Sequence, residues 1–152
     1  MNSYFAAPPT LGGPTHDGAL ENTRYHNGVI CRKLVRSPGG FVRYITASFV
    51  LTGQQRGSGK IRVWYLRDDS VGDDSMTLNT FATFLRPGER ADYNIFKDTP
   101  FNQVLRGGEV LAYFDIPFSA PIQGDGLFSV VLDFQSLDDN ETMLAGIELL
   151  LH

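Results

Sequence analysis

The chain has 152 residues, of which 42% are hydrophobic and 12% aromatic, and it carries a formal net charge of −4. This length and apolar content suit one domain with a buried core and exclude a disordered chain. Cys31 is the single cysteine, which excludes an internal disulfide, and we expect it to be a small buried hydrophobe.

Charge is distributed unevenly along the chain. Nine basic residues and no acidic residue lie between Asn22 and Arg67, whereas from Asp68 onward fifteen acidic residues accompany only four basic ones. Such a separation indicates contact with an anionic partner or subunits that meet head to tail. The alternative is that these charges are only spread over strand edges and loops, where some of them pair with acidic residues of the second half. The candidate residues for contact with nucleic acid or a neighbouring subunit are Arg24, Arg32, Lys33, Arg36, Arg43, Arg56, Lys60, Arg62 and Arg67.

Residues 1–24 are predicted to form a flexible N-terminal arm. They contain Ala6-Ala7-Pro8-Pro9 and Gly12-Gly13-Pro14, and proline and glycine at this density disfavour both helix and strand pairing. The segment lacks a basic n-region followed by an apolar run, so we expect no secretory signal peptide. No run approaches the about 18 apolar residues of a membrane-spanning helix, so we expect no membrane span.

Residues 25–152 are predicted to form a single β-sandwich domain, because strand-like runs alternate with turn residues and no helical period is sustained. In chain order, the runs are 29–36, 41–52, 60–67, 76–84, 109–118, 127–134 and 143–151. Residues 92–101 fit either a short helix or an irregular connection. Pro117 and Pro121 indicate that the run from 109 ends at a sheet edge or a bend.

Alternation predicts which side chains share a face of each strand. The predicted apolar faces are Phe41, Ile45, Ala47, Phe49 and Leu51; Val110, Ala112, Phe114, Ile116 and Phe118; Phe128, Val130, Leu132 and Phe134; and Met143, Ala145, Ile147, Leu149 and Leu151. Arg62 and Trp64 also share a face, which offers a cation beside an aromatic ring.

No catalytic residues and no cofactor are expected, so we predict that the protein is not an enzyme. The three histidines are scattered along the chain, and no G-x-S-x-G sequence is present. The run from Gly53 to Lys60 differs from a phosphate-binding loop, because a strand and not a helix follows it. The acidic loop of Asp68, Asp69, Asp73 and Asp74 is either a hydrated turn or a calcium site, and the sequence leaves both open.

The order of elements resembles the single jelly-roll coat proteins of small icosahedral viruses. The likeness lies in residues 40–52, residues 60–67, the run Phe114-Asp115-Ile116-Pro117-Phe118, and the closing pair 127–134 and 143–151. It implies an all-β, antiparallel sandwich or jelly roll of about eight strands. It further implies self-assembly into a ring or shell, located in the virion or otherwise in the cytoplasm.

The arm before Arg24 departs from many such coat proteins, because it carries no lysine or arginine. Either the basic segment faces the nucleic acid, or the chain is a vertex, spike or minor capsid protein. The alternative is an oligomeric β-sandwich binding module for a ligand, a sugar or a basic protein. Its candidate stacking residues are the aromatic side chains Trp64, Tyr65, Tyr93 and Tyr113.

Overall fold

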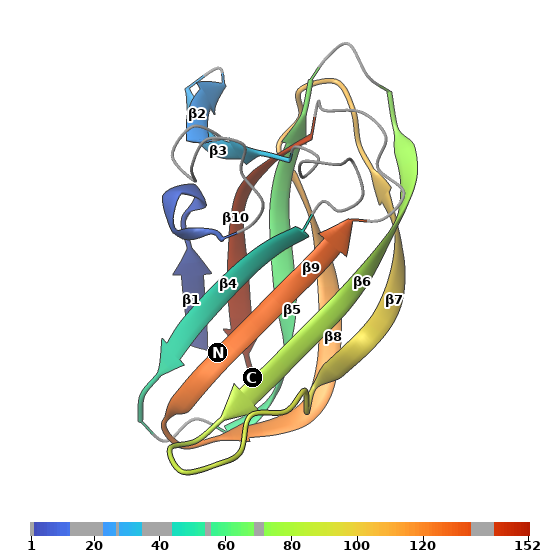
Figure 1. The fold of residues 1–152 in the computed structure, drawn as a ribbon. Coiled ribbons are helices and arrows are strands. Elements are labelled where there is room, and N and C mark those ends of the chain that lie inside the picture. Colours follow the sequence, from blue (N-terminus) through green and yellow to red (C-terminus); the bar gives the residue numbers. More distant parts are fainter. Residues whose placement is uncertain are drawn as a thin grey trace.

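A computed structural model describes residues 2–12, 23–26, 28–34, 44–53, 56–68, 72–134 and 142–152. These residues form ten β-strands and one short 3-10 helix, arranged as two antiparallel sheets that pack face to face (Figure 1). The elements are β1 (Asn2–Ala6), η1 (Pro8–Thr10), β2 (Thr23–His26), β3 (Val29–Lys33), β4 (Tyr44–Leu51), β5 (Arg56–Arg67), β6 (Asp74–Leu85), β7 (Phe96–Leu105), β8 (Ala112–Gln123), β9 (Gly126–Phe134) and β10 (Thr142–Leu151).

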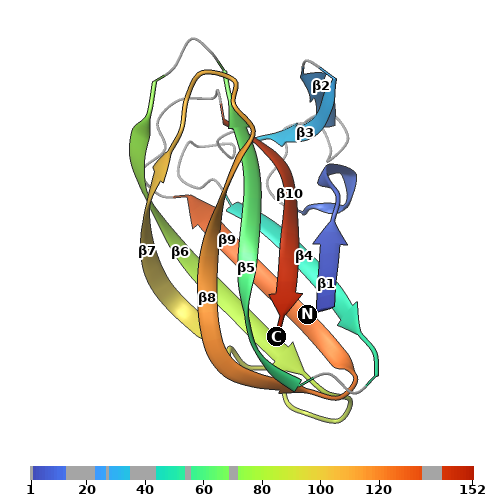
Figure 2. The same ribbon diagram turned by 180° about the vertical axis from the view of Figure 1, so that it is seen from behind.

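The strand order is that of a jelly roll. The larger sheet has the order β2-β3-β10-β5-β8, with β1 also paired to β10, and the smaller sheet has the order β4-β9-β6-β7 (Figures 1 and 2). From β3 onward, successive strands are thus distributed over two four-stranded layers in jelly-roll order. The predicted antiparallel sandwich is confirmed, and two strands near the N-terminus are added to it.

Apolar side chains on the inner faces of the two sheets form one core. The alternation predicted for β4 and β9 is confirmed, since Ile45, Leu51, Phe128 and Leu132 are all buried. The rings of Phe118 and Phe128, which come from opposite sheets, have centroids 5.6 Å apart. Burying this surface is the main source of stability for such a sandwich.

The predicted face of β10 is wrong at its N-terminal end. Leu144, not Met143, joins the main core with Ile147, because the register shifts between Leu144 and Gly146. Gly146 has φ of 154°, a backbone conformation that side-chain-bearing residues rarely adopt. Met143 instead packs with Cys31 in a second buried cluster, so the expected burial of the cysteine is confirmed.

Residues 2–12, predicted as part of a flexible arm, belong to the sandwich. β1 pairs with the stretch Ile147–Leu151 of β10, an edge that β3 does not reach because β3 pairs only with Met143 and Leu144. Leu11 is buried in the core, and Gly12 and Thr46 exchange backbone hydrogen bonds of 2.9 and 3.1 Å. Strands at a sheet edge carry unpaired backbone groups, and these groups accept and donate hydrogen bonds to the N-terminal segment. A high content of proline and glycine does not by itself reveal that such partners exist.

The segment 92–101 holds the start of β7, and β8 continues through Pro117 to Gln123. β7 and β8 are the outer strands of their sheets, so the predicted edge position of Pro117 is confirmed. Within the described ranges, no helix has the length and apolar character needed to cross a membrane.

Candidate functional site

The structure separates the nine predicted basic contact residues into different environments. Arg36 and Arg43 lie outside the described residues, as do the side chains of Arg24 and Arg56, although β2 and β5 contain their backbones. Lys33 is partly buried at the end of β3.

Arg32 and Arg67 are buried, each with 1% of its surface exposed. The Nη1 group of Arg32 donates to the carbonyl of Leu11, and burial lowers the pKa of this guanidinium. Arg67 donates from Nε to Thr142 Oγ1 at 3.1 Å and from Nη1 to the Gly72 carbonyl. Both side chains join segments of the fold, so they are not part of an accessible basic surface. A contact role for the other basic residues stays a prediction.

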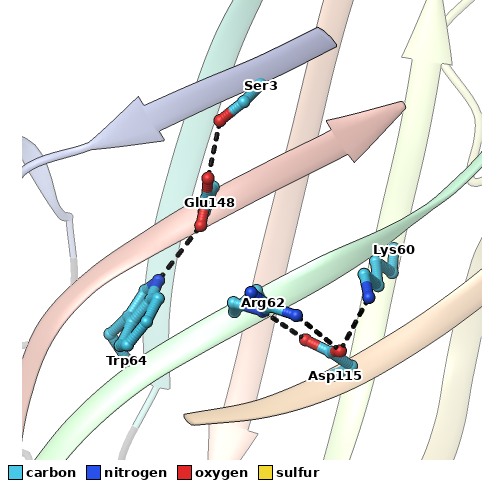
Figure 3. A network of polar contacts seen from close by, with 6 residues as sticks. All are labelled: Ser3, Lys60, Arg62, Trp64, Asp115 and Glu148. Carbon is cyan, nitrogen blue, oxygen red and sulfur yellow. Dashed lines mark hydrogen bonds and ion pairs between the residues drawn. The ribbon is translucent and has the colours of Figure 1, made fainter. Parts of the chain in front are cut away.

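Lys60 and Arg62 point outward from β5 and share one carboxylate on β8 (Figure 3). Arg62 bonds Asp115 through two pairs of atoms, Nε to Oδ1 at 2.8 Å and Nη2 to Oδ2 at 3.1 Å. Lys60 Nζ lies 3.0 Å from the same Oδ2. The hydrogen bond from Arg62, assisted by that from Lys60, holds the pKa of Asp115 below its usual range, and it raises the pKa of Arg62.

The predicted pairing of a cation with an aromatic ring is confirmed on this face. The guanidinium carbon of Arg62 lies 5.8 Å from the Trp64 ring centre and 3.9 Å from that of Tyr113. Glu148 on β10 accepts hydrogen bonds from Trp64 Nε1 at 3.1 Å and from Ser3 Oγ at 2.6 Å (Figure 3). Because two cations and two carboxylates lie together here, this cluster offers little net positive charge to a polyanion.

A groove of about 400 Å³ lies on the outer face of the smaller sheet. Its floor comes from β6 and β9, and its wall comes from the segment between β6 and β7. The lining residues are Thr83, Ala91, Asp92, Tyr93, Ser129 and Val131. Pockets of this size that combine apolar walls with a few polar groups are typical small-ligand sites.

Three hydroxyl side chains form a row across the sheet beside the groove. Strand register places Ser129 of β9 opposite both Ser48 of β4 and Thr83 of β6. The Ser48 and Ser129 hydroxyl oxygens are 3.2 Å apart, and Thr83 Oγ1 donates to the Asp92 carbonyl. Hydroxyl groups both donate and accept, so this row can match a ligand that carries hydroxyls of its own.

Aromatic rings form one side of the groove region. Tyr93 is 46% exposed, and its ring centre lies 5.2 Å from that of Phe81 with the two planes at 53°. Phe81 points outward because its neighbours Thr80 and Ala82 are buried. Tyr93 was among the predicted stacking residues. The same prediction is wrong for Tyr65, which is buried and accepts a hydrogen bond from the Arg106 amide at 2.8 Å.

The sequence pattern identified Tyr93 but not the groove around it. The alternating polar positions of β4, β6 and β9 signalled an exposed face, but only strand register brings Ser48, Ser129 and Thr83 into one row. Residues 91–95 carry no pattern that would place them beside this row.

The acidic loop does not form a recognisable metal site within the described residues, where no three or more His, Cys, Asp or Glu side chains cluster. Asp69 lies outside those residues, and Asp73 Oδ1 accepts a hydrogen bond from the Gly107 amide at 3.0 Å. For this loop, the two alternatives of a hydrated turn and a calcium site stay open.

No protein-family model matches the chain, and no curated protein matches it. Among solved structures, it is similar to an isomalto-dextranase of Arthrobacter globiformis T6 complexed with panose, with a TM-score of 0.53 and 20% identity. It is also similar to a Paenibacillus sp. cycloisomaltooligosaccharide glucanotransferase complexed with cycloisomaltoheptaose (TM-score 0.49, 10% identity) and to a Podospora anserina GH26-CBM35 β-(1,4)-mannanase (TM-score 0.47, 9% identity).

These three matches cover 97%, 99% and 99% of this chain. They cover only 23%, 18% and 28% of the three larger chains, so this chain spans less than a third of the length of each. At such identities the likeness concerns the fold, and only the first of the three has a TM-score above 0.5. The chain therefore shares its β-sandwich fold with one part of a much longer protein.

Proposed function

We propose that this protein is a β-sandwich binding module that holds an uncharged saccharide in the groove on the smaller sheet. The observation that carries the proposal is the combination of the Phe81–Tyr93 ring pair with the neighbouring row of hydroxyls. A sugar ring has an apolar face of C–H groups and an edge of hydroxyls. The aromatic side of the groove matches the C–H face of the sugar, and the row of hydroxyls matches its hydroxyl edge.

The electrostatics of the groove favour a neutral ligand. Among the described residues that line it, Asp92 is the only carboxylate, and none is a lysine, arginine or histidine. A phosphate or a polyanionic chain would lie beside a carboxylate without a compensating cation, which is unfavourable. The similarity in fold to part of an enzyme complexed with panose supports a saccharide as the first ligand class to test.

Two tyrosines that are exposed among the described residues lie on opposite faces and provide a matched test. Tyr93 is 46% exposed beside the groove, and Tyr113 is 49% exposed on the outer face of the larger sheet. Binding of panose and of a panel of neutral oligosaccharides is measured by calorimetry for the wild type, Tyr93→Ala and Tyr113→Ala. We expect Tyr93→Ala to weaken binding by about tenfold or more, from lost stacking and lost ring contact, and Tyr113→Ala to leave it unchanged.

Two results would reject the proposal. One is a wild-type protein that binds no member of the panel at millimolar concentration. The other is an equal loss of binding in the two tyrosine variants, because that would place the ligand elsewhere or reflect a general loss of structure.

A structural role in a virion, inferred from the resemblance to coat proteins, is a second candidate function. The jelly-roll strand order supports it, because this fold serves both capsid and lectin domains. The test is the mass of the protein in solution by light scattering at low and high salt, with electron microscopy of the same sample. Rings or shells would support assembly, and a monomer near 16.8 kDa under all conditions would reject it.

A further inference from the structure

The wall of the groove lies beside a stretch of β6 where no strand is paired on that side among the described strands. β7 begins at Phe96, which pairs with Ala82, so beyond this point β6 has no paired strand on that side among the described strands. The preceding residues 91–95 run back beside this free stretch of β6. A backbone hydrogen bond of 3.1 Å from the Ile95 amide to the Ala82 carbonyl resembles those between paired strands, and it marks the end of the β6–β7 ladder.

Beyond that contact, the Asn94 side chain takes the place of a paired strand. Its Oδ1 accepts a hydrogen bond from the Phe84 amide at 2.8 Å, and its Nδ2 donates to the Phe84 carbonyl at 2.7 Å. The same Oδ1 lies 3.1 Å from Thr83 Oγ1. One primary amide thus satisfies both backbone groups of Phe84, as a neighbouring strand would.

We propose that Asn94 is the positioning residue of the groove, which holds Tyr93 in the orientation that a ligand requires. Tyr93 directly precedes Asn94, and its own amide donates to the Asp92 carboxylate at 2.8 Å. Its ring contacts Phe81, which precedes the unpaired stretch of β6 that the Asn94 amide binds at Phe84. The inference rests on the proposed saccharide function for its effect on binding, but the orientation of the Tyr93 ring is measurable without a ligand.

The orientation is preformed, because the hydrogen bonds that hold the segment lie within the chain itself. Ordering the wall before binding removes an entropic cost that a mobile loop would add to each binding event. Removing one of the two Asn94–Phe84 hydrogen bonds should therefore weaken ligand binding while the two sheets stay folded.

The test is the isosteric substitution Asn94→Asp. At neutral pH it replaces the Nδ2 donor with a carboxylate oxygen that faces the Phe84 carbonyl. The matched control is Asn102→Asp, since Asn102 Oδ1 accepts a hydrogen bond from Thr77 Oγ1 at 2.9 Å and Asn102 is not among the residues that line the groove. Fluorotyrosine NMR of the ligand-free proteins reports the Tyr93 ring, with its resonance assigned by Tyr93→Phe. Calorimetry with panose, or with the best ligand of the neutral panel, reports affinity.

We expect Asn94→Asp to shift the Tyr93 resonance and to weaken binding about tenfold at pH 7, and Asn102→Asp to change neither. Acidification supplies a rescue. A carboxyl group that faces a carbonyl oxygen takes up its proton readily, so toward about pH 4 the O–H of the introduced carboxyl group can donate to the Phe84 carbonyl and restore both hydrogen bonds. The wild type measured over the same range accounts for the other carboxylates.

The outcomes distinguish this inference from the proposed function. A wild type that binds no saccharide rejects the proposed function, and the ligand-free resonance still decides whether Asn94 orients Tyr93. An unshifted Tyr93 resonance in Asn94→Asp overturns the inference. So does a binding loss that acidification fails to reverse, since that pattern reflects general destabilisation.

Discussion

The substitution Leu11→Ala tests whether residues 2–12 belong to the sandwich or form a flexible arm. Leu11 is 1% exposed and lies in the main core, although it precedes a region rich in glycine and proline. Its carbonyl accepts the hydrogen bond of the buried Arg32, and the following Gly12 pairs with Thr46 of β4. Loss of the Leu11 side chain should therefore weaken the contact between the N-terminal segment and both sheets.

The expected magnitude follows from burial. Leu→Ala removes three carbon groups, each contributing about 0.8 kcal/mol when buried, so the transfer contribution alone is about 2.4 kcal/mol. The remaining cavity increases the cost, and comparable substitutions lose about 2–5 kcal/mol. We expect a loss of about 3 kcal/mol in the free energy of unfolding. For a chain of this size, that corresponds to a decrease of about 6–12 °C in Tm.

The assay is urea denaturation followed by tryptophan fluorescence, with Leu111→Ala as the matched control. Leu111 is 50% exposed, so the same chemical change there should cost no more than about 0.5 kcal/mol. Hydrogen exchange of the Gly12 and Thr46 amides, which bond across the two segments, should accelerate in the Leu11 variant only. A Leu11→Ala loss as small as that of the control would refute the docking of this segment and restore the flexible arm.

Two further predictions concern the outer face of the larger sheet. Gly146→Ala should lower the free energy of unfolding by more than about 1 kcal/mol, because a Cβ there would collide with the Phe5 ring and because φ of 154° strains any other residue. Adding Phe5→Ala should recover part of this loss. Strictly additive effects in the double-mutant cycle would contradict this account. Asp115→Asn should lower stability at pH 7 by less than about 1 kcal/mol, since the carboxylate is partly exposed. Because Arg62 holds the folded-state pKa of Asp115 below its unfolded value, this contribution is present above the unfolded pKa of about 3.9 and is lost as the pH falls through the folded pKa. The difference between the two proteins in urea denaturation should therefore shrink on acidification, and a difference that grows would contradict the assignment.

Sequence alternation determined the fold class and most of the core. The faces predicted for β4 and β9 are buried as expected, because a period of two forces every second side chain to one side of a strand. The edge position of Pro117 followed from its missing amide hydrogen. The pairing of Arg62 with Trp64 followed from their spacing on one strand.

Tertiary structure decided the features that depend on contacts between distant segments. Glycine at 146 shifts the register of β10 by a bulge, which local alternation cannot reveal. Arg32 and Arg67 are buried because the Leu11 carbonyl and the Thr142 hydroxyl, both distant in the chain, accept their hydrogen bonds, whereas the charge pattern treats all arginines alike. The groove arises in the same way: strand register aligns the hydroxyls of three strands, and one amide side chain holds Tyr93 beside them.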